Sequence, residues 1–263
     1  MYVSVSLTSG LGNRCFQVYA MLGYAERMGF TPLFVREWIE PCSHPGPISI
    51  TDLFPTIAIV ETAASVGGPW AVHTMAGEDA FTYVPLPAYA SHVKLVGFFQ
   101  SEQYFPSIVR APSCLRSFCE QASPKRAFLH VRRGDYLLPV CQHHCVDLRD
   151  YYRKAVALFE SDTEFFVCSD DLAWCRAELP RLLPEVADHR WIWADSAGSD
   201  VATWAAMVQC LAGGICANST FSWLPGYWIL SPSKLYVLPS VWGKPPLPPA
   251  RDLIPASALV VHP

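Results

Sequence analysis

The chain has 263 residues, of which 51% are hydrophobic and 16% charged, a composition typical of folded globular proteins and not of disordered ones. Its formal net charge is −4 and it contains no basic run, so its charge does not support nucleic-acid or anionic-membrane binding. The length exceeds what a single hydrophobic core usually serves, and we expect one large or two modest α/β domains.

Strands and helices are expected to alternate in the first part of the chain. A turn, Gly10-Leu11-Gly12-Asn13, precedes a helical pattern that ends at Gly29. This turn can receive an anion or a sugar, although an ordinary tight turn explains it equally well. Residues 37–90 are rich in proline and glycine and predict an irregular lid or acceptor-binding surface. The expected strands are 3–7, 32–35, 57–60 and 93–99, and the expected helices are 15–28 and, broken, 107–121.

A second α/β unit is expected from Ser123-Pro124-Lys125 onward, which divides the chain into domains 1–122 and 123–263. Its regular alternation of strand and helix predicts a parallel sheet. The proline-rich tail predicts no further element. The expected strands are 127–131, 164–168, 191–194, 214–217 and 234–238, and the expected helices are 148–159, 172–178, 200–211 and 221–230.

Polar clusters follow three of these strands, at 130–135, 169–171 and 218–220. The carboxyl ends of parallel strands lie at one edge of a sheet, where ligands bind, so the three clusters are expected to converge. Arg132 and Arg133 lie side by side in the first cluster, and guanidinium groups suit a phosphate or diphosphate. One arginine can face a ligand while the other pairs with a carboxylate such as Asp135; a surface salt bridge is the plainer alternative.

The other two clusters leave several interpretations open. Asp170 and Asp171 suit a metal pair, an acid/base pair, a purine contact or a helix N-cap, and we favour one cap and one nucleotide contact. The segment Asn218-Ser219-Thr220 offers hydroxyl and backbone N–H groups to a phosphate, or is a plain N-cap.

The ten cysteines contain no C-x-x-C pair, and only Cys141–Cys145, with two histidines between them, has a spacing that suits a metal. We favour a cysteine-rich surface loop there. The N-terminus lacks a basic flank and a long apolar core, and no segment reaches about 18 apolar residues. We therefore expect a soluble, cytoplasmic protein without a membrane span, or one domain of a longer chain. The oligomeric state stays open.

With these residues in view, the chain resembles an α-1,2-fucosyltransferase of glycosyltransferase family 11. The resemblance rests on four stretches: Gly10–Asn13 with Phe16-Gln17, His130–Tyr136, Phe166–Asp171, and Asp200 through Asn218–Trp223. It implies a GT-B-type α/β fold of two Rossmann-like units with a donor cleft between them. The first unit would serve the acceptor, and the second would bind the donor.

The resemblance also implies inverting transfer of fucose from GDP-β-L-fucose to a glycan hydroxyl, without a metal or another cofactor. The partners are then GDP-fucose and a glycan acceptor, α-1,2 to galactose or a similar sugar. The implied catalytic residues are Arg132, Asn13 and Asp135. The implied donor-binding residues are His130, Arg132, Arg133, Gly12, Asp170, Asp171, Asn218, Ser219, Thr220 and Phe221.

The chain departs from the family pattern after Trp223, where Leu224-Pro225 replaces a second tryptophan. Two alternatives keep the same fold: transfer from another GDP-deoxyhexose such as GDP-rhamnose, and glycan binding without catalysis. Asp135 is the only carboxylate inside the double-arginine motif, and no convincing general base is identified.

Overall fold

A computed structural model describes residues 1–42, 49–75, 81–116, 122–194 and 198–263. It divides into two compact units, one of residues 1–112 with 250–255 and one of residues 113–249 with 256–263. The division falls earlier than the expected boundary at residue 123. The physical reason is that helix α3 (Ser113–Arg116) contacts helix α6 (Asp200–Val208), and Ser123 forms a parallel bridge with Cys210.

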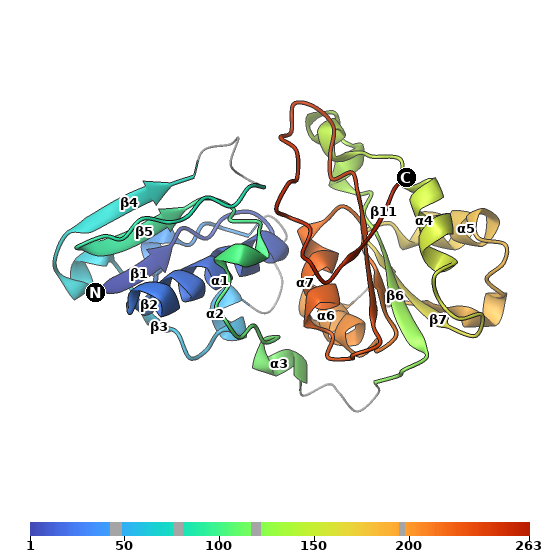
Figure 1. The fold of residues 1–263 in the computed structure, drawn as a ribbon, viewed down its shortest axis with the longest axis horizontal. Helices are drawn as coiled ribbons and strands as arrows, with labels where there is room; N and C mark the ends of the chain where they lie inside the picture. Colours follow the sequence, from blue (N-terminus) through green and yellow to red (C-terminus); the bar gives the residue numbers. More distant parts are fainter. Residues whose placement is uncertain (43–48, 76–80, 117–121, 195–197) are drawn as a thin grey trace. The chain divides into compact units, whose positions relative to one another are not determined.

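The first unit is built on a parallel five-stranded sheet in the order β3-β2-β1-β5-β4 (Figure 1). Helix α1 (Leu11–Met28) packs on β1 and β2 and ends at Gly29, as expected, in a left-handed conformation with φ 67°. The strands are β1 (Tyr2–Val5), β2 (Thr31–Val35), β3 (Ala58–Val60), β4 (Trp70–Thr74) and β5 (His92–Val96).

The expectation that residues 37–90 form an irregular surface is only partly right. This region contains β3, β4, the short helix α2 (Ile50–Leu53) and the 3-10 helices η1 (Arg36–Trp38) and η2 (Ala63–Val66), while residues 43–48 and 76–80 lie outside the described part. Strand β4 was not expected. It is an edge strand whose Val72 is 60% exposed, so it lacks the apolar run of a buried strand.

The broken helix expected at 107–121 is reduced, in the described residues, to α3; residues 117–121 lie outside them. Pro112 lies inside the expected span and immediately before α3, and a proline interrupts a helix at that point.

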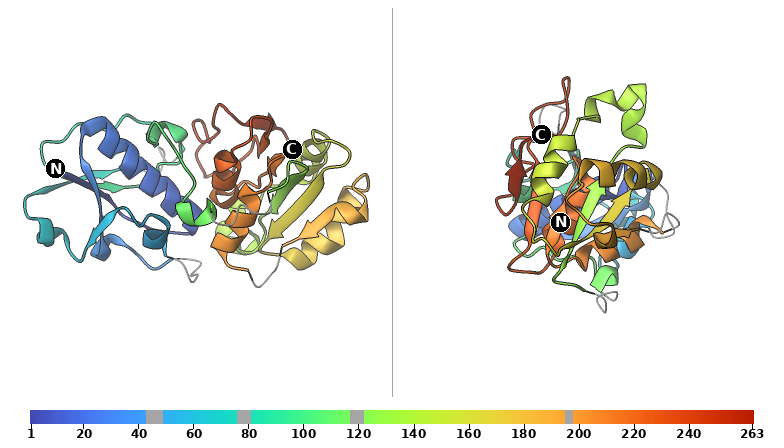
Figure 2. Two further views of the ribbon diagram at one scale, coloured as in Figure 1. Left: turned by 90° about the horizontal axis from the view of Figure 1, so that it is seen from below. Right: turned by 90° about the vertical axis from the view of Figure 1, so that its right-hand side faces the viewer.

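The second unit is built on a parallel six-stranded sheet in the order β11-β10-β9-β6-β7-β8. Helices cover both faces: α4 and α5 pack on one side, and α6 and α7 on the other (Figures 1 and 2). The strands are β6 (Arg126–Val131), β7 (Glu164–Ser169), β8 (Trp191–Trp193), β9 (Gly213–Ile215), β10 (Leu235–Pro239) and β11 (Leu259–Val261), and the further helices are α4 (Arg149–Val156), α5 (Leu172–Leu182) and α7 (Thr220–Trp228).

The middle strands of this sheet match the sequence expectation closely, because their apolar runs are buried on both faces. Strand β11 was not expected. Like β4 it lies at an edge, and Leu259 and Val260 are each 44% exposed.

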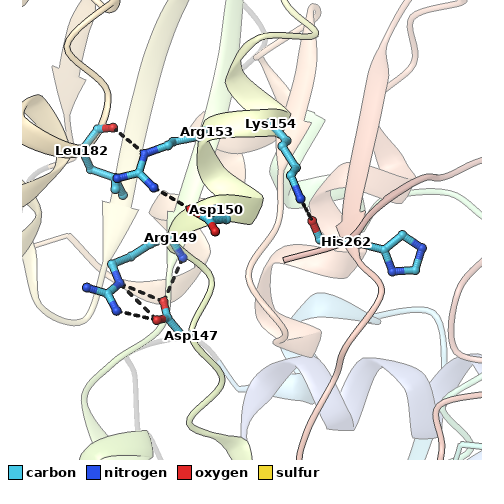
Figure 3. Close-up of polar contacts among 7 residues, drawn as sticks. All are labelled: Asp147, Arg149, Asp150, Arg153, Lys154, Leu182 and His262. Carbon is cyan, nitrogen blue, oxygen red and sulfur yellow. Dashed lines mark hydrogen bonds and ion pairs between the residues drawn. The ribbon is translucent and has the colours of Figure 1, made fainter.

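Helix α4 is tied to two other segments of its unit (Figure 3). Arg153 donates Nε–H to the carbonyl oxygen of Leu182 (3.3 Å), and Lys154 donates from Nζ to the carbonyl oxygen of His262 (3.1 Å). Arg149 forms an exposed ion pair with Asp147, in which the two side chains are 67% and 62% exposed. Such a pair contributes little to stability.

Gly23 permits a close approach between α1 and the 3-10 helix η4 (Glu102–Tyr104). A Cβ atom added to Gly23 would lie 2.0 Å from the backbone oxygen of Tyr104. Alanine favours a helix by about 1 kcal/mol over glycine. Overpacking against backbone outweighs this gain, so we expect Gly23→Ala to lower the free energy of unfolding by about 2–3 kcal/mol in urea titrations.

Gly29→Ala is the matched control, because an added Cβ would have nothing within 4 Å and only the positive φ opposes it. We expect a loss of about 1 kcal/mol there. Equal losses in the two variants would contradict the packing argument.

Candidate functional site

The strand order of the second sheet reverses between β6 and β9. From this pair, β7 and β8 follow on one side and β10 and β11 on the other. Ligands of open α/β sheets bind at such a switch point, beyond the carboxyl ends of the strands. The segments that begin at Arg132, after β6, and at Cys216, after β9, occupy this position.

Arg132 is held between two carboxylates. Its Nη2 lies 2.7 Å from Oδ1 of Asp135, and its Nη1 lies 3.2 Å from Oδ2 of Asp170. The arginine side chain is 16% exposed, and its guanidinium carbon lies 5.5 Å from the centre of the Tyr136 ring. The guanidinium is therefore fixed in place, on a side chain that keeps part of its surface open to solvent.

Arg133 points to a different partner. Its Nε lies 3.0 Å from Oδ2 of Asp171, and its guanidinium lies 4.1 Å above the ring of Trp174. Asp171 also caps α5, because its Oδ1 accepts from the Trp174 N–H at 3.0 Å. The expected cap among the two aspartates is thus Asp171, and Arg133 is a structural neighbour of Arg132.

Gly134 leaves room for Asp170. The backbone N–H of Arg133 donates to Oδ1 of Asp170 at 2.9 Å, and a Cβ atom on Gly134 would lie 2.4 Å from Oδ2. Both carboxylate oxygens of Asp170 therefore hold the loop after β6.

His130 is buried beneath this loop, 3% exposed. Burial, and in second place the charge of Arg132, lower the pKa of His130 to about 3, so its ring is neutral at physiological pH. Its Nδ1 has no hydrogen-bond partner among the described residues, and its ring lies 5.4 Å from that of Phe221. The ring is a neutral wall of the site.

The segment after β9 is fixed by Asn218. Its Nδ2 donates to the backbone oxygens of His144 and Trp242, both at 2.8 Å, and the residue is 2% exposed. Asn218 was expected to bind the donor. In the structure its amide nitrogen is already used to hold the two loops at His144 and Trp242.

Ser219 caps α7, with Oγ accepting from the Phe221 N–H at 3.3 Å. Thr220 and Phe221 form the first turn of that helix and are both half-buried. The first N–H groups of a helix lack partners inside it and attract anions.

Tyr136 joins the two strand ends. Its hydroxyl donates to the backbone oxygen of Asn218 at 3.1 Å, and its ring stacks on His144 at 5.0 Å. Burial of the hydroxyl raises the pKa of Tyr136 to about 12, so it stays protonated and able to donate. Tyr136 was not among the expected site residues, although it ends the double-arginine motif.

The structure thus brings together the loops after β6, β7 and β9, as the three polar clusters predicted. Asn13 and Gly12 belong to the first unit, in the first turn of α1. Asn13 donates Nδ2–H to Ser9 Oγ at 2.9 Å and accepts from Nε2 of Gln100 at 2.6 Å. That Gly12 and Asn13 approach the donor stays a prediction.

Among the described residues, no three His, Cys, Asp or Glu side chains are grouped to hold a metal ion. Cys141–Cys145 overlaps a 3-10 helix, η7 (Pro139–His144), and its cysteines are free thiols. No helix in the described ranges is long and apolar enough to cross a membrane.

Comparisons with known proteins agree on one class. Residues 118–239 match the model of Glycosyl transferase family 11. An α-1,2-colitosyltransferase of Escherichia coli is 26% identical over 153 residues, 52% of this chain and 51% of that protein, so the chain spans about half of its length.

Solved structures support the fold. The α-1,6-fucosyltransferase NodZ co-crystallised with GDP superposes with a TM-score of 0.51 at 15% identity, over 87% of this chain and 92% of NodZ. NodZ soaked with GDP-fucose gives 0.50 over the same shares. The expected fold class, α/β of GT-B type with two Rossmann-like units, is confirmed.

His130 gives the site a pH signature. The unfolded chain binds a proton near the ordinary pKa of 6.5, whereas the folded chain does so only near pH 3. The stability contribution of the neutral ring is therefore complete above pH 6.5 and is lost as the pH falls toward 3. We expect the unfolding free energy to fall by up to about 1.4 kcal/mol per pH unit from this group.

Urea unfolding of the wild type and of His130→Leu between pH 7 and pH 4.5 measures this slope. The variant should lose stability more gradually on acidification. Parallel curves would show that His130 is charged in the folded chain.

Proposed function

We propose that the protein transfers L-fucose from GDP-β-L-fucose to a hydroxyl of a glycan acceptor, with inversion and without a metal. The match of residues 118–239 to the model of Glycosyl transferase family 11 supports this proposal. The observation that carries the proposal is Arg132, fixed at the switch point of the second sheet and partly open to solvent.

In the reaction, the acceptor oxygen forms a bond to the anomeric carbon while the bond from that carbon to the β-phosphate oxygen breaks. The bonding electrons leave with GDP, and the acceptor proton passes to solvent. Negative charge grows on the leaving oxygen, and a fixed guanidinium stabilises this charge more in the transition state than in the ground state. We propose that Arg132 supplies this stabilisation.

The start of α7 would hold the rest of the diphosphate. The positive end of the α7 dipole would attract the diphosphate, and Ser219 keeps the first turn in shape by accepting from the Phe221 N–H. His130 and Phe221 would provide an uncharged wall beside it. This division explains why anion binding needs only a few basic residues in a chain with net charge −4.

Asp135 and Asp170 act, in this proposal, through Arg132 and not on substrate. Oδ1 of Asp135 lies 2.7 Å from Nη2 of Arg132, so we assign Asp135 the role of positioning this guanidinium. Asp170 holds the loop after β6 through Arg132 and the backbone N–H of Arg133. We give this role precedence over its expected contact with the nucleotide base.

A 1,2 linkage to galactose or a similar sugar is the finer proposal, supported by the α-1,2 specificity in the name of the E. coli relative. The same name favours a second candidate, transfer of colitose or another deoxyhexose. Thermal-shift and transfer assays with GDP-fucose, GDP-colitose and GDP-rhamnose separate them. A larger stabilisation by UDP-sugars than by GDP-sugars would contradict the nucleotide assignment.

We expect Arg132→Ala to lower kcat/KM for transfer by about 10²–10³, the usual loss for removal of one donor that stabilises a developing anion. The assay follows release of GDP from GDP-fucose with methyl β-D-galactopyranoside as acceptor, and without acceptor for slow hydrolysis. Hydrolysis of GDP-fucose without acceptor shows the loss of rate even if methyl β-D-galactopyranoside is a poor acceptor.

Arg149→Ala is the matched control, because it removes an exposed, ion-paired arginine of the same unit (Figure 3). It should keep activity within about twofold, since exposed pairs contribute about 0–1 kcal/mol. Equal activity in Arg132→Ala and the wild type would exclude the proposed role.

A further inference from the structure

Helix α7 contains a proline in its interior, Pro225, although its first turn belongs to the candidate functional site. Any other residue at this position would donate its backbone N–H to the carbonyl oxygen four residues earlier, which is that of Phe221. Proline has no N–H, and its ring crowds the same carbonyl group. Phe221 therefore lacks its usual hydrogen-bond donor inside the helix.

Trp204 of the neighbouring helix α6 supplies the missing hydrogen bond. Its indole Nε1–H donates to the carbonyl oxygen of Phe221 at 2.8 Å, and the two rings lie 5.5 Å apart. Trp204 is fully buried, and α6 packs on α7 (Figure 1). The indole N–H thus takes the place of the backbone N–H that Pro225 lacks.

The next two carbonyl groups of α7 also accept from side chains outside the helix. The carbonyl oxygen of Ser222 accepts from Sγ of Cys216 at 3.3 Å, and that of Trp223 accepts from the hydroxyl of Tyr236 at 2.9 Å. Gly226 admits the tyrosine ring, because an added Cβ atom would lie 2.5 Å from it. A thiol is a weak donor, so the contacts made by the indole and the phenol are the stronger ones.

Phe221 is the residue through which this support reaches the site. Its N–H donates to Oγ of Ser219 and its carbonyl oxygen accepts from Trp204, so side chains hold both of its backbone groups. Its ring lies 5.4 Å from that of the buried His130, which precedes the loop of Arg132. A change at the Phe221 carbonyl would therefore move both the first turn of α7 and the uncharged wall of the site.

We propose that Trp204 is a positioning residue of the nucleotide site, and that its indole N–H holds Phe221 and the first turn of α7 in the geometry that binds the diphosphate. The inference rests on the proposed function for the identity of the ligand. Trp204 acts through Phe221 and does not touch the substrate. Because Phe221 would contact GDP equally before and during transfer, loss of its support should weaken binding and leave kcat unchanged.

Trp204→Phe removes the indole N–H and keeps an aromatic ring. We expect the Kd for GDP, measured by titration calorimetry, and the KM for GDP-fucose, measured by its hydrolysis without acceptor, to rise by about threefold to tenfold, as for the loss of one hydrogen bond. A merely structural residue would give another result, a lower melting temperature and a lower kcat at unchanged Kd and KM.

Pro225→Ala provides a rescue, because it returns a backbone N–H to the position that faces the Phe221 carbonyl in a helix. In the Trp204→Phe background it should restore the Kd for GDP to the wild-type value. On its own it should leave this Kd unchanged, since a carbonyl oxygen can accept two hydrogen bonds. Rescue by a backbone N–H separates the hydrogen bond of Trp204 from the bulk of its ring.

Two control variants match these changes away from the site. Trp191→Phe removes a buried indole whose Nε1 has no hydrogen-bond partner among the described residues. Pro180→Ala returns an N–H to the interior of α5. Both should bind GDP as the wild type does, even where Trp191→Phe lowers the melting temperature.

An unchanged Kd and KM in Trp204→Phe would overturn the assignment, and so would a weakened Kd that Pro225→Ala does not restore. If Trp204→Phe alone does not fold, the double variant carries the test: a wild-type Kd supports the assignment, and a Kd raised tenfold overturns it. Failure of the proposed function gives a different pattern, in which the wild type binds GDP but neither transfers nor hydrolyses GDP-fucose. The set of Kd values for GDP then still tests Trp204.

Discussion

The second unit depends on the pairing of two consecutive arginines with two consecutive aspartates on adjacent strands. The register of β6 and β7 places Val131 opposite Ser169, so the residues that follow each strand face each other in order. Arg132 meets Asp170, and Arg133 meets Asp171. Because successive side chains of an extended chain point to opposite sides, one pair faces the open end of the sheet while the other packs on α5. Gly134 is required since any Cβ atom would displace Asp170.

The same network sets how strongly the site can bind an anion. Arg132 and Arg133 face three carboxylates, Asp135, Asp170 and Asp171, so the cluster carries a formal charge of 2 − 3 = −1. In the proposed function, a diphosphate must compete with these carboxylates for Arg132. Such a site fixes the geometry of the anion more than it raises the affinity for it. Donors on the neutral N-terminus of α7 then supply attraction without adding a basic residue. Removing one member of such a cluster lowers the free energy of unfolding by more than the energy of its own ion pair. The reason is that the remaining charged groups are left without a partner.

Sequence alone predicted the central strands, the helices between them and the three polar clusters, because these follow from local apolar runs and from the edge rule for parallel sheets. It missed β4 and β11, whose exposed Val72 and Leu259 break the buried pattern at sheet edges. It named Arg132, Asp170 and Asp171, and it named Asp135 as a partner of an arginine. It did not predict the pairs Arg132–Asp170 and Arg133–Asp171, since these depend on the register between strands. Tyr136 was missed because its hydroxyl bonds to Asn218, a residue 82 positions away in the sequence.

The two sheets differ in strand order and in the setting of their arginines. The second sheet reverses its order between β9 and β6, whereas the first, β3-β2-β1-β5-β4, shows no such reversal. After β6, Arg132 is held by two carboxylates on a side chain that is 16% exposed. In the first unit, Arg14 is 4% exposed and donates to the carbonyl oxygens of Ser9 and Glu40. A guanidinium turned onto backbone carbonyls fixes the backbone, whereas one that keeps contact with solvent suits the developing charge of the leaving group in the proposed function.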